Sequence, residues 1–195
     1  MELLCLCSSP NIRGVSCGLA QYLYDRMKAV SQSAALYHTH GLHLSPCKAC
    51  MRCKNTGICV LDDDLRLILN QFAKADTVIL AAPVYAADIN VDMKVFLERS
   101  HSLIPPNMGP FPSPGNKLEK NLILVLSQGS PPEYHEEIPE KYKQYFRALG
   151  VMNQQTVRAC NVPSNSDFSP NNYLEEIGVC DRLISVMSQG GREIQ

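Results

Sequence analysis

Runs of apolar residues alternate along the chain with stretches in which apolar residues recur at helical spacing. The run TVILAA at 77–82 is apolar throughout, as expected of a strand that a parallel sheet buries on both faces. We therefore place this strand at the centre of a sheet. The five predicted strands are residues 2–7, 34–37, 77–82, 121–126 and 151–160.

A helical pattern follows each predicted strand. In the first of these stretches Leu19, Leu23 and Met27 share one helix face. The run Asp62–Asp64 precedes the second, where carboxylates are favoured by the helix dipole, so we expect these residues to cap that helix rather than to bind a metal. The predicted helices cover residues 14–29, 65–72, 93–97, 142–149 and 173–187.

Strict alternation of strands and helices predicts the α/β class. The chain shows no internal repeat and no composition change that marks a domain boundary. We expect one domain over residues 1–195, a doubly wound five-stranded parallel sheet in a three-layer α/β/α arrangement with strand order 2-1-3-4-5.

Composition excludes several partner classes. The chain has 195 residues, of which 45% are hydrophobic, with 18 basic and 19 acidic side chains. A net charge of -1 gives no electrostatic footprint for nucleic acid or for an anionic membrane surface. No apolar run approaches the ~20 residues of a membrane helix. The opening MELLCLCSSP lacks a basic segment and reads as a first strand rather than a secretory signal.

Nine cysteines in such a chain indicate a reducing compartment, which we expect to be the cytoplasm. Four of them fall in a cysteine loop (residues 45–61) with the spacing C-x2-C-x2-C-x5-C, which can converge on one [4Fe-4S] cluster. Zinc, a disulfide pair and reduced thiols without metal remain alternatives. The candidate ligands are Cys47, Cys50, Cys53 and Cys59, whereas Cys5, Cys7, Cys17, Cys160 and Cys180 are expected to pack as small apolar side chains, Cys17 being the least certain of them.

Three loops follow strands at the same edge of the predicted sheet, where ligands of open α/β sheets bind. The first loop (residues 8–16) offers Ser9, Asn11 and Ser16 as phosphate donors with Arg13 as a countercharge, although Ser and Asn are also ordinary helix caps. The second loop (residues 83–88) can support a planar ring, unless Tyr85 only covers the sheet edge. The third loop comprises residues 127–132.

A proline-rich segment at 104–118 is too irregular for a helix or strand and long enough to cover a ligand or a partner. Together with the cysteine loop, it leads us to expect at least a dimer, because one small domain has little surface to cover two long irregular elements.

Three motifs carry a resemblance to the flavodoxin-like NAD(P)H-dependent FMN reductase family, and within it to the iron-sulfur flavoproteins. SSPNIRGVS resembles the family phosphate loop G-S-P-R-x-x-G-N-T, with Ser8, Asn11 and Val15 in place of its Gly, Arg and Asn. PVYAADI followed by MKVFLERS resembles the ring-binding loop and its helix, and PCKACMRC followed by CVLDDD resembles the iron-sulfur subgroup.

This resemblance implies FMN as cofactor, NAD(P)H as electron donor and a [4Fe-4S] cluster on the four loop cysteines. It implies that the FMN phosphate lies at Ser9 and Ser16 and that the ring lies on the backbone from Pro83 to Asp88. We expect the cluster to sit near the flavin. The expected cofactor-binding residues are Ser9, Pro10, Asn11, Arg13, Ser16, Cys17, Pro83, Val84, Tyr85, Ala86, Ala87, Asp88, Ser127 and Gly129.

The expected function is an FMN-dependent oxidoreductase that passes electrons to a small-molecule or protein redox partner, as a homodimer or homotetramer. No acid/base pair or nucleophile triad stands out, and a flavin supplies the redox chemistry itself. Two alternatives remain: a flavodoxin-type electron carrier without NAD(P)H activity, and a metal-binding or structural cysteine-loop protein on the same scaffold.

Overall fold

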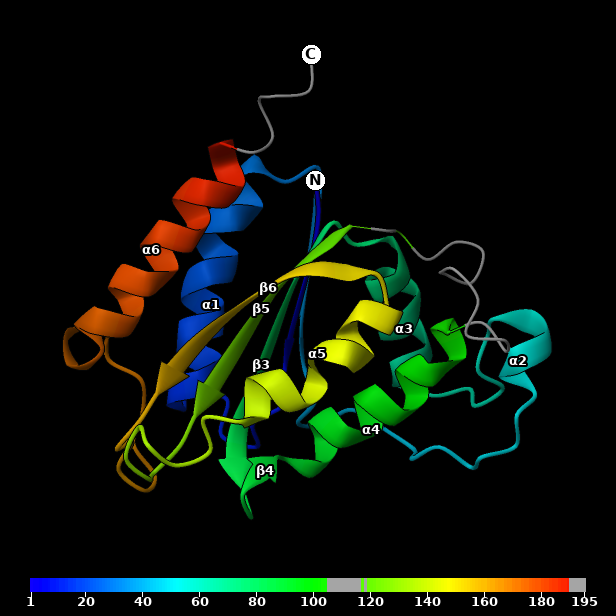
Figure 1. The fold of residues 1–195 in the computed structure, drawn as a ribbon, viewed down its shortest axis with the longest axis horizontal. Helices are drawn as coiled ribbons and strands as arrows, with labels where there is room; N and C mark the ends of the chain where they lie inside the picture. Colours follow the sequence, from blue (N-terminus) through cyan, green and yellow to red (C-terminus); the bar gives the residue numbers. More distant parts are fainter. Residues whose placement is uncertain (105–116, 118, 190–195) are drawn as a thin grey trace.

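The computed structural model describes residues 1–104, 117 and 119–189, and its centre is a parallel sheet (Figure 1). The strands run in the order β2-β1-β3-β5-β6, and all four pairings between them are parallel. This is the predicted 2-1-3-4-5 order once the two-residue β4, antiparallel to β3, is left out. The bounds are β1 (Glu2–Cys7), β2 (Ser33–His38), β3 (Thr77–Tyr85), β4 (Asp88–Ile89), β5 (Lys120–Ser127) and β6 (Val151–Ala159).

Helices cover both faces of the sheet, which confirms the three-layer prediction (Figure 1). On one face α1 and α6 pack over the sheet, and on the other α3, α4 and α5 do so. The apolar positions that predicted α3, among them Leu65 and Phe72, are buried there. The helices are α1 (Val15–Met27), α2 (Cys53–Thr56), α3 (Asp64–Lys74), α4 (Val91–Ser100), α5 (Ile138–Ala148) and α6 (Leu174–Gln189), with 3-10 turns Lys28–Val30, His101–Leu103 and Pro170–Asn172.

The central strand is the one that the sequence predicted. β3 lies between β1 and β5 and is buried from Thr77 through Pro83. It is three residues longer than expected, because Pro83, Val84 and Tyr85 continue the strand instead of opening a loop. Proline is tolerated near the end of a strand, where its missing N–H leaves no central ladder bond unmade.

The second loop is therefore a tight hairpin rather than a long turn. Tyr85 pairs with Asp88, so only Ala86 and Ala87 connect the two strands. Both have positive φ, 49° and 61°, as a two-residue turn that matches the strand twist requires. Alanine gives no sequence signal for such a turn, which is why the hairpin was not predicted.

The expected cap of α3 also differs in detail. Asp63 does occupy the position before the helix, but its carboxylate makes no side-chain cap hydrogen bond. It binds Arg99 instead, as described below. Most of the proline-rich segment 104–118, which we expected to cover a ligand or partner, lies outside the described residues. No helix of the described part of the chain is long and apolar enough to cross a membrane.

Candidate functional site

A cavity of ≈ 370 Å³ opens at the carboxyl edge of the sheet. Its walls come from the carboxyl ends of β3 and β5 and from segments that follow β1, β5 and β6, so it lies at the switch point where the chain order reverses between β1 and β3. The volume falls within the range of about 300–1,000 Å³ typical of small-molecule sites. The lining residues are Ser9, Asn11, Gly14, Val15, Ser16, Pro83, Val84, Tyr85, Ser127, Gln128, Gly129 and 162–166.

The first loop is held in shape by its own side chains. Asn11 donates its backbone N–H to Ser9 Oγ at 3.2 Å and accepts the Arg13 N–H on Oδ1 at 3.1 Å. Gly14 caps α1 in an extended conformation without a side-chain hydrogen bond. No side chain caps the first-turn amides of α1, and free amides at the positive end of a helix dipole are groups to which anions can bind.

A buried contact joins this loop to the start of α4. Ser8 Oγ donates to Asn90 Oδ1 at 2.6 Å, and the Asn90 amide donates to the Ser8 carbonyl at 2.6 Å. Both side chains are buried. Sequence reasoning missed this pair, because its members are 82 residues apart in the chain. Ser8, which stands where the family motif has glycine, therefore braces the loop.

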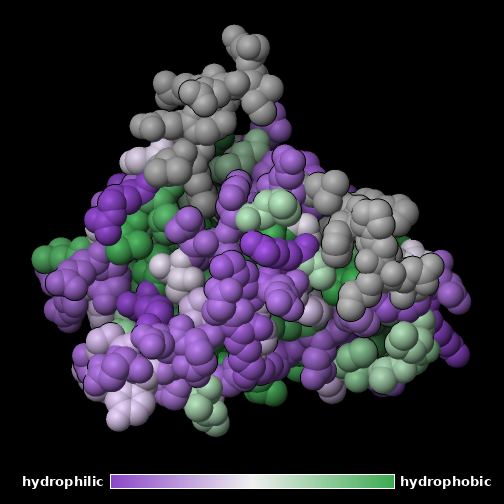
Figure 2. Space-filling view, viewed as in Figure 1, coloured by the Kyte–Doolittle hydropathy of each residue, from purple (hydrophilic) through white to green (hydrophobic). Residues whose placement is uncertain are grey.

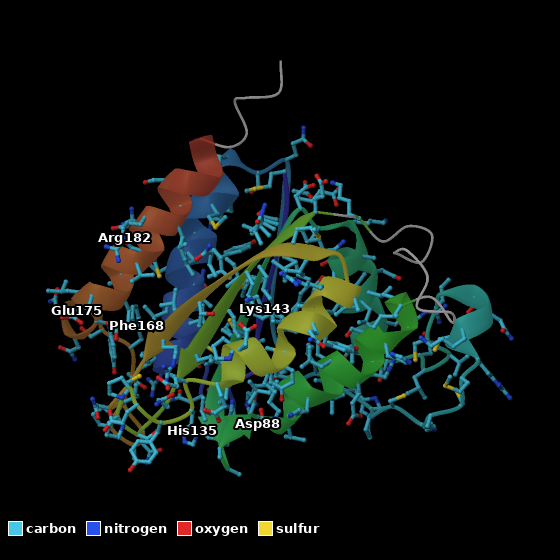
Figure 3. All side chains as sticks on the ribbon, viewed as in Figure 1. Asp88, His135, Lys143, Phe168, Glu175 and Arg182 are labelled. Atoms are coloured by element: carbon cyan, nitrogen blue, oxygen red, sulfur yellow. The ribbon has the colours of Figure 1, made fainter. Side chains whose placement is uncertain are left out.

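Three of the residues predicted to bind the cofactor, two in the first loop and one in α1, do not line the cavity. Pro10, Arg13 and Cys17 are absent from its walls. Arg13 Nε pairs with Asp167 Oδ2 at 3.4 Å, and its carbonyl accepts the Phe168 N–H at 2.7 Å. These contacts tie the first loop to the segment after β6, near the labelled Phe168 in Figure 3.

The end of β3 lines the cavity, whereas the turn that follows it leads to Asp88, which contacts α4 and α5. Pro83, Val84 and Tyr85 line the cavity, whereas Ala86, Ala87 and Asp88 do not. The Asp88 carboxylate binds three side chains of α4 and α5 (Figure 3), Lys94 at 2.7 Å, Lys141 at 2.6 Å and Tyr142 at 2.7 Å.

These contacts determine the charge of Asp88. Burial by itself would raise its pKa, but the hydrogen bonds from Lys141, Lys94 and Tyr142 outweigh burial and hold the pKa well below its usual range. The carboxylate is therefore ionised, and it anchors the hairpin to two helices instead of facing a ligand.

The third loop is shaped by one side chain that sequence reasoning missed. The Gln128 amide donates to the carbonyls of Pro131 and Tyr134 at 2.8 and 2.9 Å, and its oxygen accepts a bond from Arg158 at 3.2 Å. The fold of 128–134 around this amide presents Ser127 and Gly129 to the cavity.

A fourth segment, residues 162–166, completes the wall and was also missed. Its sequence, VPSNS, carries the same small and hydroxyl-rich signal as the first loop and follows a strand at the same edge. Ser166 Oγ is buried and, within the described part of the chain, has no hydrogen-bond partner. A buried hydroxyl without a partner is costly, so a bound polar group would satisfy it.

The cavity's chemistry fits FMN. It offers hydroxyls at Ser9, Ser16 and Ser166, uncapped amides of α1, and an apolar strand end against which a flat ring can lie. None of its lining residues is charged. An anionic phosphate in this cavity would meet backbone amides, hydroxyls and the helix dipole rather than a cationic side chain.

The four loop cysteines meet at a second, small cavity of ≈ 30 Å³. Cys47 and Cys50 are exposed, Cys53 and Cys59 are partly exposed, and all nine cysteines of the chain are free thiols. The wall opposite the thiols is the C-terminal end of α4, with Glu98 and Arg99. The structure thus brings the predicted ligand set together.

Arg99 fixes both ends of the cysteine loop. Its buried guanidinium forms a bidentate pair with Asp63, at 2.7 and 3.0 Å. It also donates to the Ser45 carbonyl at 2.8 Å and, through Nε, to Cys59 Sγ at 3.1 Å. Burial by itself would raise the pKa of Asp63, but the Arg99 and Ser45 hydrogen bonds lower it, so the pair is ionic.

Further donors surround the sulfur atoms. The Ala49 N–H donates to Cys47 Sγ at 3.4 Å, and Lys54 Nζ binds the carbonyls of His101 and Ile104 at 2.7 Å each. Ala49 and Met51 both have positive φ, which is costly for residues with a Cβ. Hydrogen bonds to sulfur are one of the ways in which a protein sets the potential of an iron-sulfur cluster.

The spacing of the loop thiols can be compared with that of a closed zinc site. In a tetrahedral zinc site with Zn–S bonds of about 2.3 Å the sulfurs lie about 3.8 Å apart. No three of the loop thiols, all of which the structure describes, lie within 4.8 Å of one another. The loop thiols are therefore spaced more widely than the sulfurs of a closed four-thiolate zinc site.

The two cavities have no lining residue in common. The cysteine loop packs against the C-terminal end of α4, whereas the flavin-type cavity lies at the carboxyl edge of the sheet, and Figure 1 shows α2 on the opposite flank from the carboxyl ends of β5 and β6. The two sites are therefore separate cavities, and our expectation that the cluster lies near the flavin stays a prediction.

Comparisons with known sequences agree with this geometry. A family model described as NADPH-dependent FMN reductase matches residues 1–159. An iron-sulfur flavoprotein from Methanosarcina thermophila is 40% identical over 57 residues, 29% of this chain and 30% of that protein. One from Archaeoglobus fulgidus is 27% identical over 115 residues, 59% of this chain and 48% of that protein. The chain thus matches less than half the length of either relative.

Solved structures share the fold over nearly the whole chain. The NAD(P)H:quinone oxidoreductase from Methanothermobacter marburgensis has a TM-score of 0.72 at 12% identity, covering 96% of this chain and 97% of that one. An FMN-dependent NADH-azoreductase from Bacillus anthracis, in complex with FMN, has a TM-score of 0.65 at 16% identity, covering 94% and 100%. At such identities the likeness establishes a common fold.

Proposed function

This chain belongs to the NADPH-dependent FMN reductase family, and from that premise we propose that it is an FMN-dependent oxidoreductase that takes electrons from NAD(P)H. The observation that carries the proposal is the uncharged cavity of ≈ 370 Å³ at the carboxyl edge, with an uncapped helix N-terminus on one side and a strand end on the other. When bound, FMN supplies the redox chemistry.

The chain's own residues bind and orient the cofactor in this proposal. Ser9, Ser16 and the first-turn amides of α1 hold the phosphate, and the Ser166 hydroxyl gains a partner. Backbone groups from Pro83 to Tyr85 and at Gly129 line the ring, where they exclude water and offer hydrogen bonds. Ala86, Ala87 and Asp88 act indirectly, since they fix the direction of the hairpin.

We further propose that Cys47, Cys50, Cys53 and Cys59 hold a [4Fe-4S] cluster. The convergence of four thiols on one cavity, with N–H donors to two of the sulfurs, supports this assignment, as do the iron-sulfur flavoproteins among the relatives. Arg99 Nε donates to Cys59 Sγ at 3.1 Å, and this hydrogen bond orients one of the four proposed ligands.

Free thiols throughout also fit a reducing compartment, so we place the protein in the cytoplasm with a small-molecule or protein redox partner.

Anaerobic purification, followed by reconstitution with FMN, iron and sulfide, tests the proposal. We expect one FMN per chain, about four irons per chain, and rapid bleaching of the flavin band on addition of NADPH or NADH. Iron should be lost in Cys50→Ala and retained in the matched variant Cys180→Ala, whose thiol is buried in the core.

Each alternative function predicts a different result of this reconstitution experiment. A bound flavin that dithionite bleaches and pyridine nucleotides do not would identify an electron carrier. Absence of any flavin band would favour a metal-binding or structural protein. Iron-free protein whose flavin is still bleached normally would leave a flavin reductase and refute the cluster.

A further inference from the structure

A second group of sulfur ligands lies inside the fold, away from the cysteine loop. Cys7 ends β1, His38 ends β2, and the two residues are directly paired across the parallel strands. Cys17 reaches the same point from the first turn of α1, which covers this face of the sheet. One ligand atom from each of the three residues lies within 4.8 Å of the other two.

The surroundings of this group are unusual for core thiols. Cys7 is 0% exposed and Cys17 is 1% exposed, so neither sulfur is positioned for chemistry with solvent. The imidazole beside them presents a buried Nδ1 that has no hydrogen-bond partner among the described residues. Native proteins seldom leave such an atom unpaired, so the position calls for a ligand that an imidazole nitrogen can bind.

We propose that Cys7, Cys17 and His38 bind one thiophilic metal ion, for which Zn²⁺ is the best match. Two cysteines and one histidine form a known zinc ligand set that leaves a fourth position for water or another small ligand. The ligand atoms of a tetrahedral zinc ion are about 3.3–3.8 Å apart. Small side-chain rotations would close the present spacing to that value.

Charge balance favours the ion in this buried place. Zn²⁺ replaces one proton on each thiol, and both protons leave to solvent. Two thiolates and a neutral imidazole around a dication carry no net charge, so the site buries no unpaired charge. The alternative reading, which the sequence suggested, is that Cys7 and Cys17 only fill space as apolar side chains.

An ion at this position would stabilise the structure of the first loop. Cys7 immediately precedes Ser8 and Ser9, and Cys17 immediately follows Ser16. The ion would join β1, α1 and β2 directly behind the first loop, and so fix both ends of the loop that lines the larger cavity. Binding to the folded state alone should also raise the melting temperature with metal concentration.

Cobalt is a suitable probe, since Co²⁺ in a zinc site gives sulfur-to-metal charge-transfer absorption. The test uses the full chain, reduced and anaerobic, with Cys47, Cys50, Cys53 and Cys59 changed to serine so that the cysteine loop binds no metal. We expect one Co²⁺ per chain with charge-transfer bands, displacement by Zn²⁺, and a melting temperature that rises with added Zn²⁺.

Matched variants in the same background assign the ligands. Cys17→Ala should abolish the charge-transfer bands, and His38→Gln should weaken Zn²⁺ binding at least about tenfold, a difference of about 1.4 kcal/mol. Cys180→Ala, another buried thiol, and His40→Gln, an exposed imidazole, should leave both readouts unchanged.

The proposal fails if the folded parent variant shows no charge-transfer bands and no Zn²⁺-dependent stabilisation. It fails equally if Cys17→Ala and His38→Gln bind as tightly as the parent. Should the four-serine variant not fold, the native sequence gives the same decision: Cys17→Ala must lower the number of Co²⁺ bound by one, and an unchanged number refutes the site.

Discussion

Two fully buried cations show how differently single residues can be accommodated. Arg99 and Lys120 have 1% and 0% exposure. Arg99 meets a carboxylate, two backbone carbonyls and a sulfur, so its charge is fully used. Lys120 Nζ donates to the carbonyl oxygens of Ala73 and Lys117 and lies over the Phe72 ring, and among the described residues it forms no ion pair. We expect Arg99 to stabilise its surroundings, and we expect the contribution of Lys120 to the unfolding free energy to depend on pH.

Removal of Arg99 should be costly. Arg99→Met leaves Asp63 buried without its partner, which costs about 3–5 kcal/mol when a buried pair is broken. The free energy of unfolding in urea measures this. Arg66→Met removes the exposed partner of Asp62 and should cost less than about 1 kcal/mol. Equal losses in the two variants would contradict the bracing role of Arg99.

Lys120 should make the stability rise with pH. Burial and the nearby Lys117 lower the pKa of Lys120 to about 8, below the value of about 10.4 for an unfolded lysine. Between these values the unfolded chain binds more protons, so the unfolding free energy increases as pH rises. At neutral pH the charged amine is destabilising.

Lys120→Met isolates this contribution. At pH 7 the variant should be more stable than the unmutated protein. This difference in unfolding free energy should shrink by about 2–3 kcal/mol by pH 10, because only the unmutated protein carries Lys120, whose deprotonation stabilises the folded state. Urea unfolding of both proteins across this range measures the difference. A difference that stays constant with pH would show that the buried amine keeps an ordinary pKa.

At the scale of elements, the hairpin between β3 and β4 carries a strained turn. Ala87 has a φ of 61°, a conformation that glycine adopts without penalty. Ala87→Gly should therefore raise the free energy of unfolding by about 0.5–1 kcal/mol. Ala29→Gly, in an ordinary 3-10 turn, should lower it by a similar amount. A loss in both variants would mean that the turn is not strained.

The elements also show what the sequence can and cannot predict. All five parallel strands were predicted within three residues of their ends, because apolar runs of a buried sheet are a local signal. The β4 hairpin was missed because its turn is Ala-Ala. The ion pair that holds the cysteine loop was missed because it joins Asp63 and Arg99, which are 36 residues apart.

Some residues of the candidate site could likewise be predicted from the sequence, whereas others could not. Ser9, Asn11, Ser16, Ser127 and Gly129 were predicted from strand ends and line the cavity. Arg13 and Asp88 were also expected to bind the cofactor, but each forms an ion pair with a residue that does not line the cavity. Such pairings form between elements that are distant in sequence, and no local pattern encodes them.

At the scale of the whole molecule, the cysteine loop presents apolar side chains to solvent. Met51, Ile58 and Val60 are 58%, 49% and 46% exposed within ten residues of chain. Figure 2 shows apolar surface at this flank within a mostly hydrophilic face. Large apolar groups gathered in one place often mark an interface.

We therefore predict at least a dimer in solution. Sedimentation velocity of the FMN-loaded protein at micromolar concentration measures the mass directly. Replacement of Met51, Ile58 and Val60 by serine should shift the protein toward monomer if the loop lies in the interface. A native protein that sediments as a monomer with flavin bound would contradict the prediction.

The most direct test of the whole account is the affinity for FMN of the native chain and of a Ser9→Ala/Ser16→Ala variant, measured by flavin fluorescence quenching. A hydrogen bond to a charged group contributes about 1.5–3 kcal/mol, so the variant should bind FMN at least about tenfold more weakly. Ser185→Ala, on the outer surface of α6, should bind normally. Equal affinity in the native chain and the double variant would contradict the placement of FMN at the carboxyl edge.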